Sequence, residues 1–229
     1  MTKPSPEEIA AGHAFYTKRS LAVYDLAILG YFSLVAWRCP ARRVLGHYNT
    51  HVSANHLDVG VGTGYFLDHC TYPSTPPRLA LMDLNPACLE VTAERVARFR
   101  PECYKGDILE PVTVEAEKFD SIGMNYLLHC VPGTIRTKAV VFKHLKALAN
   151  PGATVFGATL LHGGVRRNWM ARQVMARNNR HGIFSNADDD LEGLEWALAE
   201  HLTDTEVSVV GCVGLFSGRV PELTNGDER

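Results

Sequence analysis

Three glycines and a carboxylate form the motif with the clearest chemical meaning in this chain. Asp58 stands two residues before Gly60. Gly62 and Gly64 then follow at alternate positions. Glycines with this spacing allow a tight turn between a strand and a helix, and they let a bound molecule approach the amide groups of the helix N-terminus. The motif therefore predicts a ligand-binding turn.

The position of the acid distinguishes between two kinds of ligand. A dinucleotide-binding turn has the pattern Gly-x-Gly-x-x-Gly, which would need glycine where this chain has Tyr65. The Asp58 carboxylate would repel a pyrophosphate, but it can pair with an ammonium group. The motif thus favours a ligand that has a cationic amino acid end and no phosphates.

Two further acids stand where the other parts of such a ligand would lie. Asp83 ends the next expected strand, 19 residues after Gly64, and an acid there can accept both hydroxyls of a ribose. Asp107 ends a third expected strand, where a carboxylate can accept the exocyclic amino group of adenine. An amino acid, a ribose and an adenine without phosphates describe S-adenosylmethionine.

These residues need strands that bring them to one edge of a sheet. Strands are expected at residues 55–60, 79–83, 102–105, 119–125 and 153–161. Helices are expected at 64–70, from Pro86 to about Phe99, and at 134–149, where Asn150-Pro151-Gly152 should stop the helix. Such alternation indicates a parallel sheet with right-handed crossovers.

The two ends of the chain differ from this pattern. Residues 1 to about 12 are expected to form a loose tail, and residues 13–48 a helical region that breaks near Cys39-Pro40. Helices at 168–180 and 191–201 precede two short strands, at 206–210 and 211–216. These closely spaced strands predict an antiparallel addition to the parallel sheet.

Five segments together resemble the motifs of the class I S-adenosylmethionine-dependent methyltransferases, in that family's order and spacing. They are LDVGVGTG (57–64), LALMDLNP (79–86), YKGDI (104–108), FDSIGMNYLLHCV (119–131) and LANPGATVFGATLL (148–161). The resemblance covers roughly residues 55–216 and is to the small, single-domain type. It implies a Rossmann-like α/β fold, whose seven strands have the order 3-2-1-4-5-7-6 with an antiparallel last strand.

The resemblance also implies a division of the chain. We expect residues 1–50 to form an N-terminal helical cap or lid, 51–220 the methyltransferase domain, and 221–229 a tail. An aromatic stripe at 15–37 would then cover an apolar substrate, because extra N-terminal helices normally cover the site in this family. The alternative is that the stripe belongs to the ordinary core.

The resemblance assigns residues to the cofactor, S-adenosyl-L-methionine, and its product, S-adenosyl-L-homocysteine. The expected cofactor-binding residues are Asp58, Gly60, Gly62, Gly64, Asp83, Leu84, Asp107, Ile108, Asn125, Tyr126, Tyr16 and Tyr24. The first four would lie at the methionine end, and Asp83 would hold the ribose. Leu84, Asp107 and Ile108 would surround the adenine. The pair after the fourth strand, 125–126, would lie beside the sulfonium and face the substrate.

Two histidines are candidates for a general base. Methyl transfer is an in-line displacement at the sulfonium methyl group, so the protein mainly supplies approach geometry and desolvation. A base helps if the nucleophile is a hydroxyl. His129 follows the fourth strand and His162 ends the fifth. The alternatives are that His129 lines its helix and that His162 is an exposed loop residue.

Composition excludes several classes of protein. The 229 residues include 23 Lys+Arg against 25 Asp+Glu, so the net charge of −2 gives no electrostatic case for binding nucleic acid or an acidic membrane. The longest apolar stretch, at 26–37, is shorter than the about 20 residues that span a bilayer. Six scattered cysteines without a Cys-x-x-Cys pair predict neither a metal site nor a disulfide framework, and they favour the cytoplasm.

The leading hypothesis is methyl transfer to a small, fairly apolar metabolite, as in secondary metabolite biosynthesis, by a protein that can form a homodimer. Three alternatives stay open. One is a protein or RNA methyltransferase, although such enzymes often have an Asn/Asp-Pro-Pro-aromatic motif where this chain has Asn125-Tyr126-Leu127-Leu128. Another is a cofactor-binding protein that catalyses a different reaction, such as a cyclisation. The third is a binding or scaffold protein with an inactive site.

Overall fold

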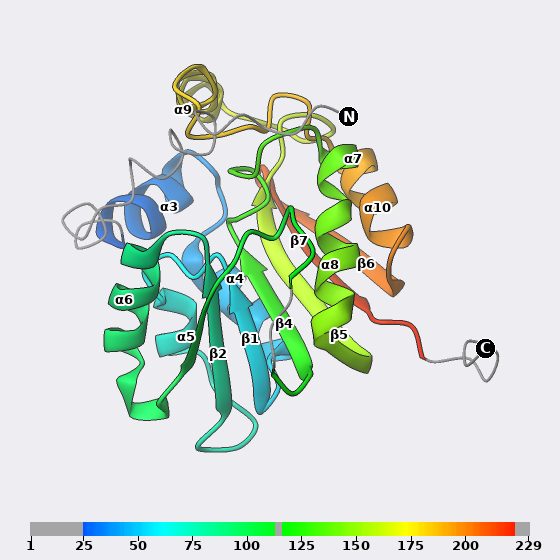
Figure 1. Cartoon of the computed structure of the whole chain (residues 1–229). Coiled ribbons are helices and arrows are strands. Elements are labelled where there is room, and N and C mark those ends of the chain that lie inside the picture. Colours follow the sequence, from blue (N-terminus) through cyan, green and yellow to red (C-terminus); the bar gives the residue numbers. More distant parts are fainter. Residues whose placement is uncertain (1–24, 113–115, 223–229) are drawn as a thin grey trace.

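A seven-stranded mixed sheet with the order β3-β2-β1-β4-β5-β7-β6 runs through the centre of the molecule (Figure 1). The computed structural model describes residues 25–112 and 116–222. The strands are β1 (Asn55–Val59), β2 (Arg78–Asp83), β3 (Glu102–Lys105), β4 (Phe119–Asn125), β5 (Ala149–Leu160), β6 (Thr203–Val210) and β7 (Val213–Arg219). The first five are parallel, and β7 is antiparallel to β5 and β6. The predicted strand order is therefore confirmed.

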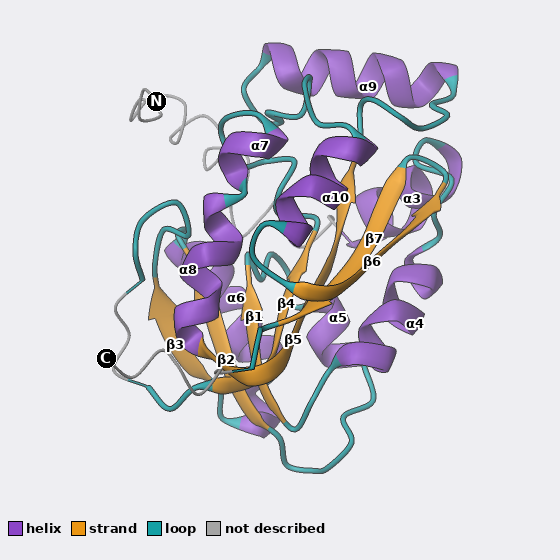
Figure 2. Ribbon diagram, turned by 90° about the vertical axis from the view of Figure 1, so that its right-hand side faces the viewer, coloured by secondary structure: helices purple, strands orange, loops and turns teal. Residues whose placement is uncertain are grey.

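Helices cover both faces of the sheet. The described helices are η1 (Asp25–Phe32, π-helical), α3 (Ser33–Val35), α4 (Ala41–His51), α5 (Tyr65–His69), α6 (Pro86–Arg95), η2 (Ala97–Phe99, a 3-10 turn), α7 (Ile135–Lys138), α8 (Val140–Leu148), α9 (Trp169–Arg180) and α10 (Leu191–Ala199). Helices α4, α5 and α6 lie on one face, and α7, α8 and α10 lie on the other (Figure 1). Helix α9 lies beyond one end of the strands in both views (Figure 2).

Side-chain caps begin the helices where the sequence signals them. The Asn85 side chain accepts a hydrogen bond from the backbone of Ala87, with Pro86 at the first helical position of α6. Asn168 caps α9 in the same way. Each cap satisfies an amide that the helix itself leaves unpaired, which is worth about 1 kcal/mol. Local chemistry therefore sets these helix starts.

The helix ends before residue 150, as predicted, but residues 150–152 belong to a strand. Helix α8 ends at Leu148, and Asn150-Pro151-Gly152 belongs to β5, which begins at Ala149. Ala149 pairs with Phe119, and the Gly152 amide donates to the carbonyl of Val220 at 2.9 Å. Pairing with neighbouring strands thus overrides the turn preference of this tripeptide. The same pairing makes β6 and β7 longer than expected.

The N-terminal region is only partly within the described residues. Residues 1–24, including Tyr16, Tyr24 and the expected tail, lie outside them. The predicted break near Cys39-Pro40 is confirmed, since α3 ends at Val35 and α4 begins at Ala41. Helix α4 packs on the sheet, and its Tyr48 is fully buried there. None of the described helices is long and apolar enough to cross a membrane.

Candidate functional site

The glycine turn joins β1 to α5 in a conformation that requires glycine. Gly60 and Gly64 have φ angles of 71° and 72°, in the left-handed region that side chains disfavour. A Cβ atom at Gly60 would lie 2.7 Å from a methyl carbon of Leu127, and one at Gly64 would lie 2.7 Å from Thr92. The turn is therefore tight, and it places backbone amides at one wall of a pocket.

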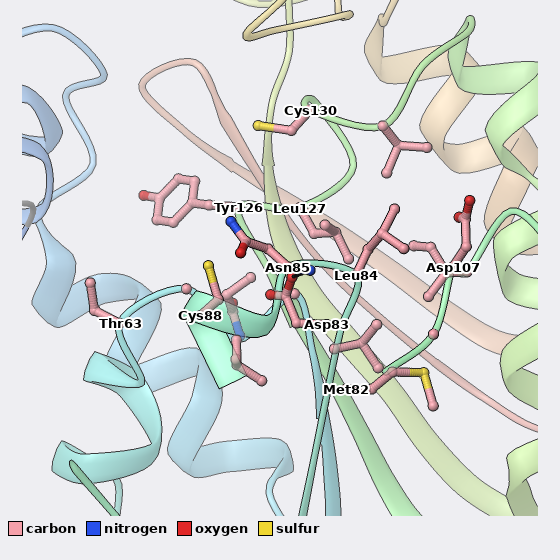
Figure 3. A pocket seen from close by; sticks show the side chains of 18 of the residues that line it. Thr63, Met82, Asp83, Leu84, Asn85, Cys88, Asp107, Tyr126, Leu127 and Cys130 are labelled. Carbon is pink, nitrogen blue, oxygen red and sulfur yellow. Dashed lines mark hydrogen bonds between the residues drawn. The ribbon is translucent and has the colours of Figure 1, made fainter. Parts of the chain in front are cut away.

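The pocket opens where β1, β2, β3 and β4 end (Figure 3). Its volume is about 180 Å³. Its wall includes these predicted cofactor-binding residues: Gly60, Gly62, Asp83, Leu84, Asp107, Ile108, Asn125 and Tyr126. The predicted Asp58 and Gly64 do not line it, and Tyr16 and Tyr24 lie outside the described residues. The strand ends thus bring residues from four separate motifs to one cavity.

Asp83 lies at the centre of the pocket (Figure 3). Its carboxylate accepts a hydrogen bond from the backbone amide of Asn85 at 2.8 Å, and the backbone amides of Gly62 and Val61 lower its pKa. Burial, with a smaller contribution from the charge of Asp58, nevertheless raises the pKa of Asp83 to about 6. A carboxylate held in this way at the end of β2 can accept the two hydroxyls of a ribose.

Asp107 lies apart from Asp83 on the pocket wall (Figure 3). One of its carboxylate oxygens accepts a hydrogen bond from the amide of Leu109 at 2.9 Å. That bond fixes the side chain at the turn after β3, and the buried Ile108 lies beside it. The pair can provide a polar and an apolar contact to an adenine ring.

Two residues at the end of β4, Asn125 and Tyr126, have features that are typical of a binding site. Both polar atoms of the Asn125 side chain are buried without a hydrogen-bond partner among the described residues. Such atoms cost free energy unless a ligand or water satisfies them. Tyr126 has a φ angle of 58°, although it is not glycine, while its amide donates to the carbonyl of Ala158. Strained residues of this kind cluster at functional sites.

Asp58 lies behind the pocket wall. The residue is buried, and one carboxylate oxygen accepts a hydrogen bond from the Tyr48 hydroxyl at 2.8 Å. Its two successors in the chain, Val59 and Gly60, line the pocket. The carboxylate therefore stands next to the glycine turn but on the side that faces α4.

The structure brings neither candidate histidine to the pocket wall. His129 is buried, with its ring edge-on to Phe184 at a centroid distance of 4.7 Å. Burial, together with the charge of Lys138, lowers the pKa of His129 to about 3. His162 is partly buried and also has a lowered pKa, mainly through desolvation. The neighbour of His129 in sequence, Cys130, does line the pocket.

The N-terminal segment contributes a wall that sequence reasoning did not assign to single residues. Leu29 of η1 is buried and lines the pocket. Four residues earlier, Asp25 accepts hydrogen bonds from the Thr63 hydroxyl, at 2.6 Å, and from the Arg95 guanidinium, at 2.5 Å. Thr63 lies between Gly62 and Gly64, so its position in the glycine motif could have predicted that it lines the pocket. No spacing in the sequence links Leu29 to a turn thirty residues later.

Comparison with known proteins identifies the family. A family model described as a methyltransferase domain matches residues 39–200. The chain belongs to this methyltransferase family. The matched residues include the glycine turn and the pocket residues after β2, β3 and β4. The enzyme therefore uses S-adenosyl-L-methionine, as the sequence predicts.

Relatives of this methyltransferase match it over most of their length. Demethylluteothin O-methyltransferase of Streptomyces thioluteus is 40% identical over 210 residues, which cover 92% of this chain and 91% of the relative. The physcion biosynthesis cluster O-methyltransferase of Aspergillus chevalieri is 38% identical over 225 residues, which cover 97% and 100%. Among solved structures, the N-methyltransferase NodS from Bradyrhizobium japonicum WM9, in complex with S-adenosyl-L-homocysteine, matches with a TM-score of 0.60 at 19% sequence identity. The match covers 90% of this chain and 100% of NodS, and it supports the fold.

Proposed function

We propose that this methyltransferase transfers a methyl group to a hydroxyl oxygen of a small, fairly apolar metabolite. The observation that carries the proposal is one pocket with a polar part and an apolar part. Asp83, Asp107 and Asn125 make the polar part, which suits the cofactor. The rest of the wall is mainly apolar and includes Leu29, Phe66, Tyr126, Leu127, Val131 and Pro132.

The chain's own residues would bind and orient the reactants. Bound S-adenosyl-L-methionine supplies an electrophilic methyl group together with its leaving group. Asp83 would accept the ribose hydroxyls. The side-chain amide of Asn125, which has no partner among the residues that the structure describes, would bond to the cofactor or the acceptor. Leu29 and Leu127 would exclude water from the reacting atoms. Rate enhancement would then come mainly from proximity and orientation.

A phenol or enol is the acceptor that this pocket suits best. Among the described residues, the only carboxylates on the pocket wall are Asp83 and Asp107, both of which we assign to the cofactor. An acidic hydroxyl loses its proton with little help from a protein base, and a flat ring fits an apolar wall. The two relatives named as O-methyltransferases support oxygen as the acceptor atom.

The test is transfer of a labelled methyl group. The purified enzyme is incubated with S-adenosyl-L-methionine labelled at its methyl carbon and with a panel of phenols, enols and matched amines, with bulk RNA and protein as separate acceptors. We expect label on hydroxylated aromatic compounds and none on the amines. The control is Asp83→Ala, which should transfer none. Label only on RNA or protein, or turnover without label in any acceptor, would contradict the proposal.

A further inference from the structure

A chain of buried hydrogen bonds ends on the Asp58 carboxylate. The Ser121 hydroxyl on β4 lies 2.8 Å from Nδ1 of His56. Nε2 of His56 lies 2.7 Å from the Tyr48 hydroxyl, which donates to Oδ2 of Asp58 at 2.8 Å. All of these side chains except Asp58 are completely buried, and only 8% of the Asp58 side chain is exposed.

The single hydroxyl proton of Tyr48 sets the direction of two bonds in this network. Tyr48 uses it to donate a hydrogen bond to Asp58, so its oxygen accepts from Nε2–H of His56. Nδ1 of the same ring lies against the Ser121 hydroxyl, which is also 2.8 Å from the Ser53 hydroxyl. Each donor is polarised by the next one, and hydrogen bonds in such chains reinforce each other at low dielectric. The carboxylate therefore receives a strengthened hydrogen bond from a side chain that cannot move away.

The surrounding sheet leaves the Asp58 side chain little room to turn. Asp58 on β1 pairs in register with Gly123 on β4. A Cβ atom at Gly123 would lie 3.0 Å from Oδ2 of Asp58 and 3.1 Å from the His56 ring. Glycine at this position makes space for the carboxylate and the ring together. Three elements, α4, β1 and β4, thus hold one carboxylate in a single orientation.

The position of this carboxylate suits a cation at the pocket. Val59 and Gly60, which follow Asp58 directly, line the pocket, and the charge of Asp58 reaches Asp83 inside it. Tyr48 donates a hydrogen bond to Oδ2 of the Asp58 carboxylate, and Nε2 of His56 lies 3.6 Å from the same oxygen. Among the described residues, none donates a hydrogen bond to Oδ1. A nearly buried carboxylate with one donor is costly unless a positive charge offsets it.

We propose that Tyr48, supported by His56 and Ser121, is a positioning residue that holds the Asp58 carboxylate behind the glycine turn, from where its negative charge attracts the ammonium group of the cofactor's amino acid end. This inference rests on the proposed function, because it needs the cofactor to bind in this pocket. It divides the cofactor into two parts that depend on different residues. The adenosine part depends on Asp83 and Asp107, and the amino acid part depends on Tyr48 through Asp58.

The test compares two ligands that differ in the amino acid end. S-Adenosyl-L-homocysteine has this end, and 5′-methylthioadenosine lacks it. Calorimetry measures both affinities for the wild type and for Tyr48→Phe, which removes only the hydroxyl. We expect the variant to bind S-adenosyl-L-homocysteine about tenfold more weakly, as for loss of one hydrogen bond to a charged group. Its affinity for 5′-methylthioadenosine should stay unchanged.

Two further variants separate positioning from a structural role. Tyr72→Phe is the matched control, because the hydroxyl of this buried tyrosine donates to the carbonyl of Leu67 and not to the Asp58 carboxylate, and its removal should change neither affinity. Asp58→Asn and the double variant with Tyr48→Phe complete a double-mutant cycle. The effects of the two substitutions on the free energy of S-adenosyl-L-homocysteine binding should not add. If Tyr48→Phe does not fold, Ser121→Ala should give the same selective loss in smaller measure.

The outcomes are distinct for the two proposals. A selective loss for S-adenosyl-L-homocysteine together with non-additivity supports the inference. Equal losses for both ligands, no loss at all, or additive effects would overturn it, because a structural role would not distinguish the amino acid end. Failure of the wild type to bind either ligand would instead overturn the assignment of the cofactor pocket.

Discussion

At the scale of single residues, burial changes the chemistry of the side chains that the sequence points to. Asp83 and Asp107 could be predicted, because acids at the ends of parallel strands must meet at one edge of the sheet. Burial could not be read from the same pattern. It raises the pKa of Asp83 to about 6 and lowers that of His129 to about 3. The carboxyl keeps a place in the pocket, whereas the histidine lies behind the wall.

The raised pKa of Asp83 predicts that cofactor binding depends on pH. Ribose hydroxyls donate to the ionised carboxylate, which predominates at pH 7 and is lost as the pH falls through about 6. If only the ionised form binds, the affinity for S-adenosyl-L-homocysteine should fall about tenfold between pH 7 and pH 5. Calorimetry across this range measures the slope. Asp83→Asn should bind weakly and lose this slope, and an equal slope in that variant would contradict the assignment.

The position of His129 predicts a small effect on catalysis. Removal of a general base costs about 10²- to 10⁴-fold in rate. His129 does not line the pocket, so His129→Gln should lose far less than a hundredfold in methyl transfer at saturating acceptor. The measurement is the initial rate with the acceptor found by labelling, and its control is the melting temperature of the variant. A loss of a hundredfold or more in a folded variant would restore His129 as the base.

At the scale of elements, local signals and tertiary pairing decide different boundaries. The caps at Asn85 and Asn168 start their helices where the sequence predicts, because one side chain and one amide suffice. The tripeptide 150–152 follows the end of its helix, as the sequence predicts, but it forms part of β5 because β4 and the chain at Val220 pair with this region. The link between η1 and the glycine turn also escapes prediction, because it joins Asp25 to residues far along the chain.

The Asp25 link predicts that the N-terminal segment controls release of the product. Asp25 binds Thr63 and Arg95, while Leu29 of the same element lines the pocket. In Asp25→Asn the ion pair with Arg95 is lost, so η1, which contributes Leu29 to the pocket wall, should move away from the pocket more often. A partly exposed ion pair is worth up to about 1 kcal/mol, so S-adenosyl-L-homocysteine should dissociate about fivefold faster. Stopped-flow displacement measures this rate.

A remote ion pair provides the control for that experiment. Arg78 and Glu102 form an ion pair of similar exposure between β2 and β3, and neither residue lines the pocket. Glu102→Gln should therefore leave the dissociation rate unchanged. If both variants release the product at the wild-type rate, the bonds of Asp25 to Thr63 and Arg95 do not hold η1 against the pocket.

At the scale of the whole molecule, the sequence predicts the sheet better than it predicts what fills the spaces between layers. Strand order follows from alternation and from the family resemblance, and it is confirmed. The series of hydrogen bonds from Ser121 to Asp58 runs from β4 to β1, on to Tyr48 of α4 and back to β1. No local sequence pattern could indicate it. Histidines packed in these layers also link the stability of the fold to pH.

The buried His129 predicts a loss of stability in acid. Its pKa is about 3 in the folded state, against 6.5 for the free side chain, so the unfolded state binds more protons between these values. Its contribution is complete above pH 6.5 and is lost as the pH falls towards 3. Wild type should therefore lose about 2 kcal/mol relative to His129→Gln between pH 6.5 and pH 5. Urea unfolding at both pH values measures the difference, and a constant difference would contradict it.

The most direct test of the whole account is titration of the wild type and of Asp83→Ala with S-adenosyl-L-homocysteine. The account predicts that the wild type binds with one site per chain and that the variant, with an unchanged unfolding transition, does not bind. Absence of binding to the wild type, or equal binding by the two proteins, would contradict the assignment of the pocket at the ends of β1, β2, β3 and β4 to the cofactor.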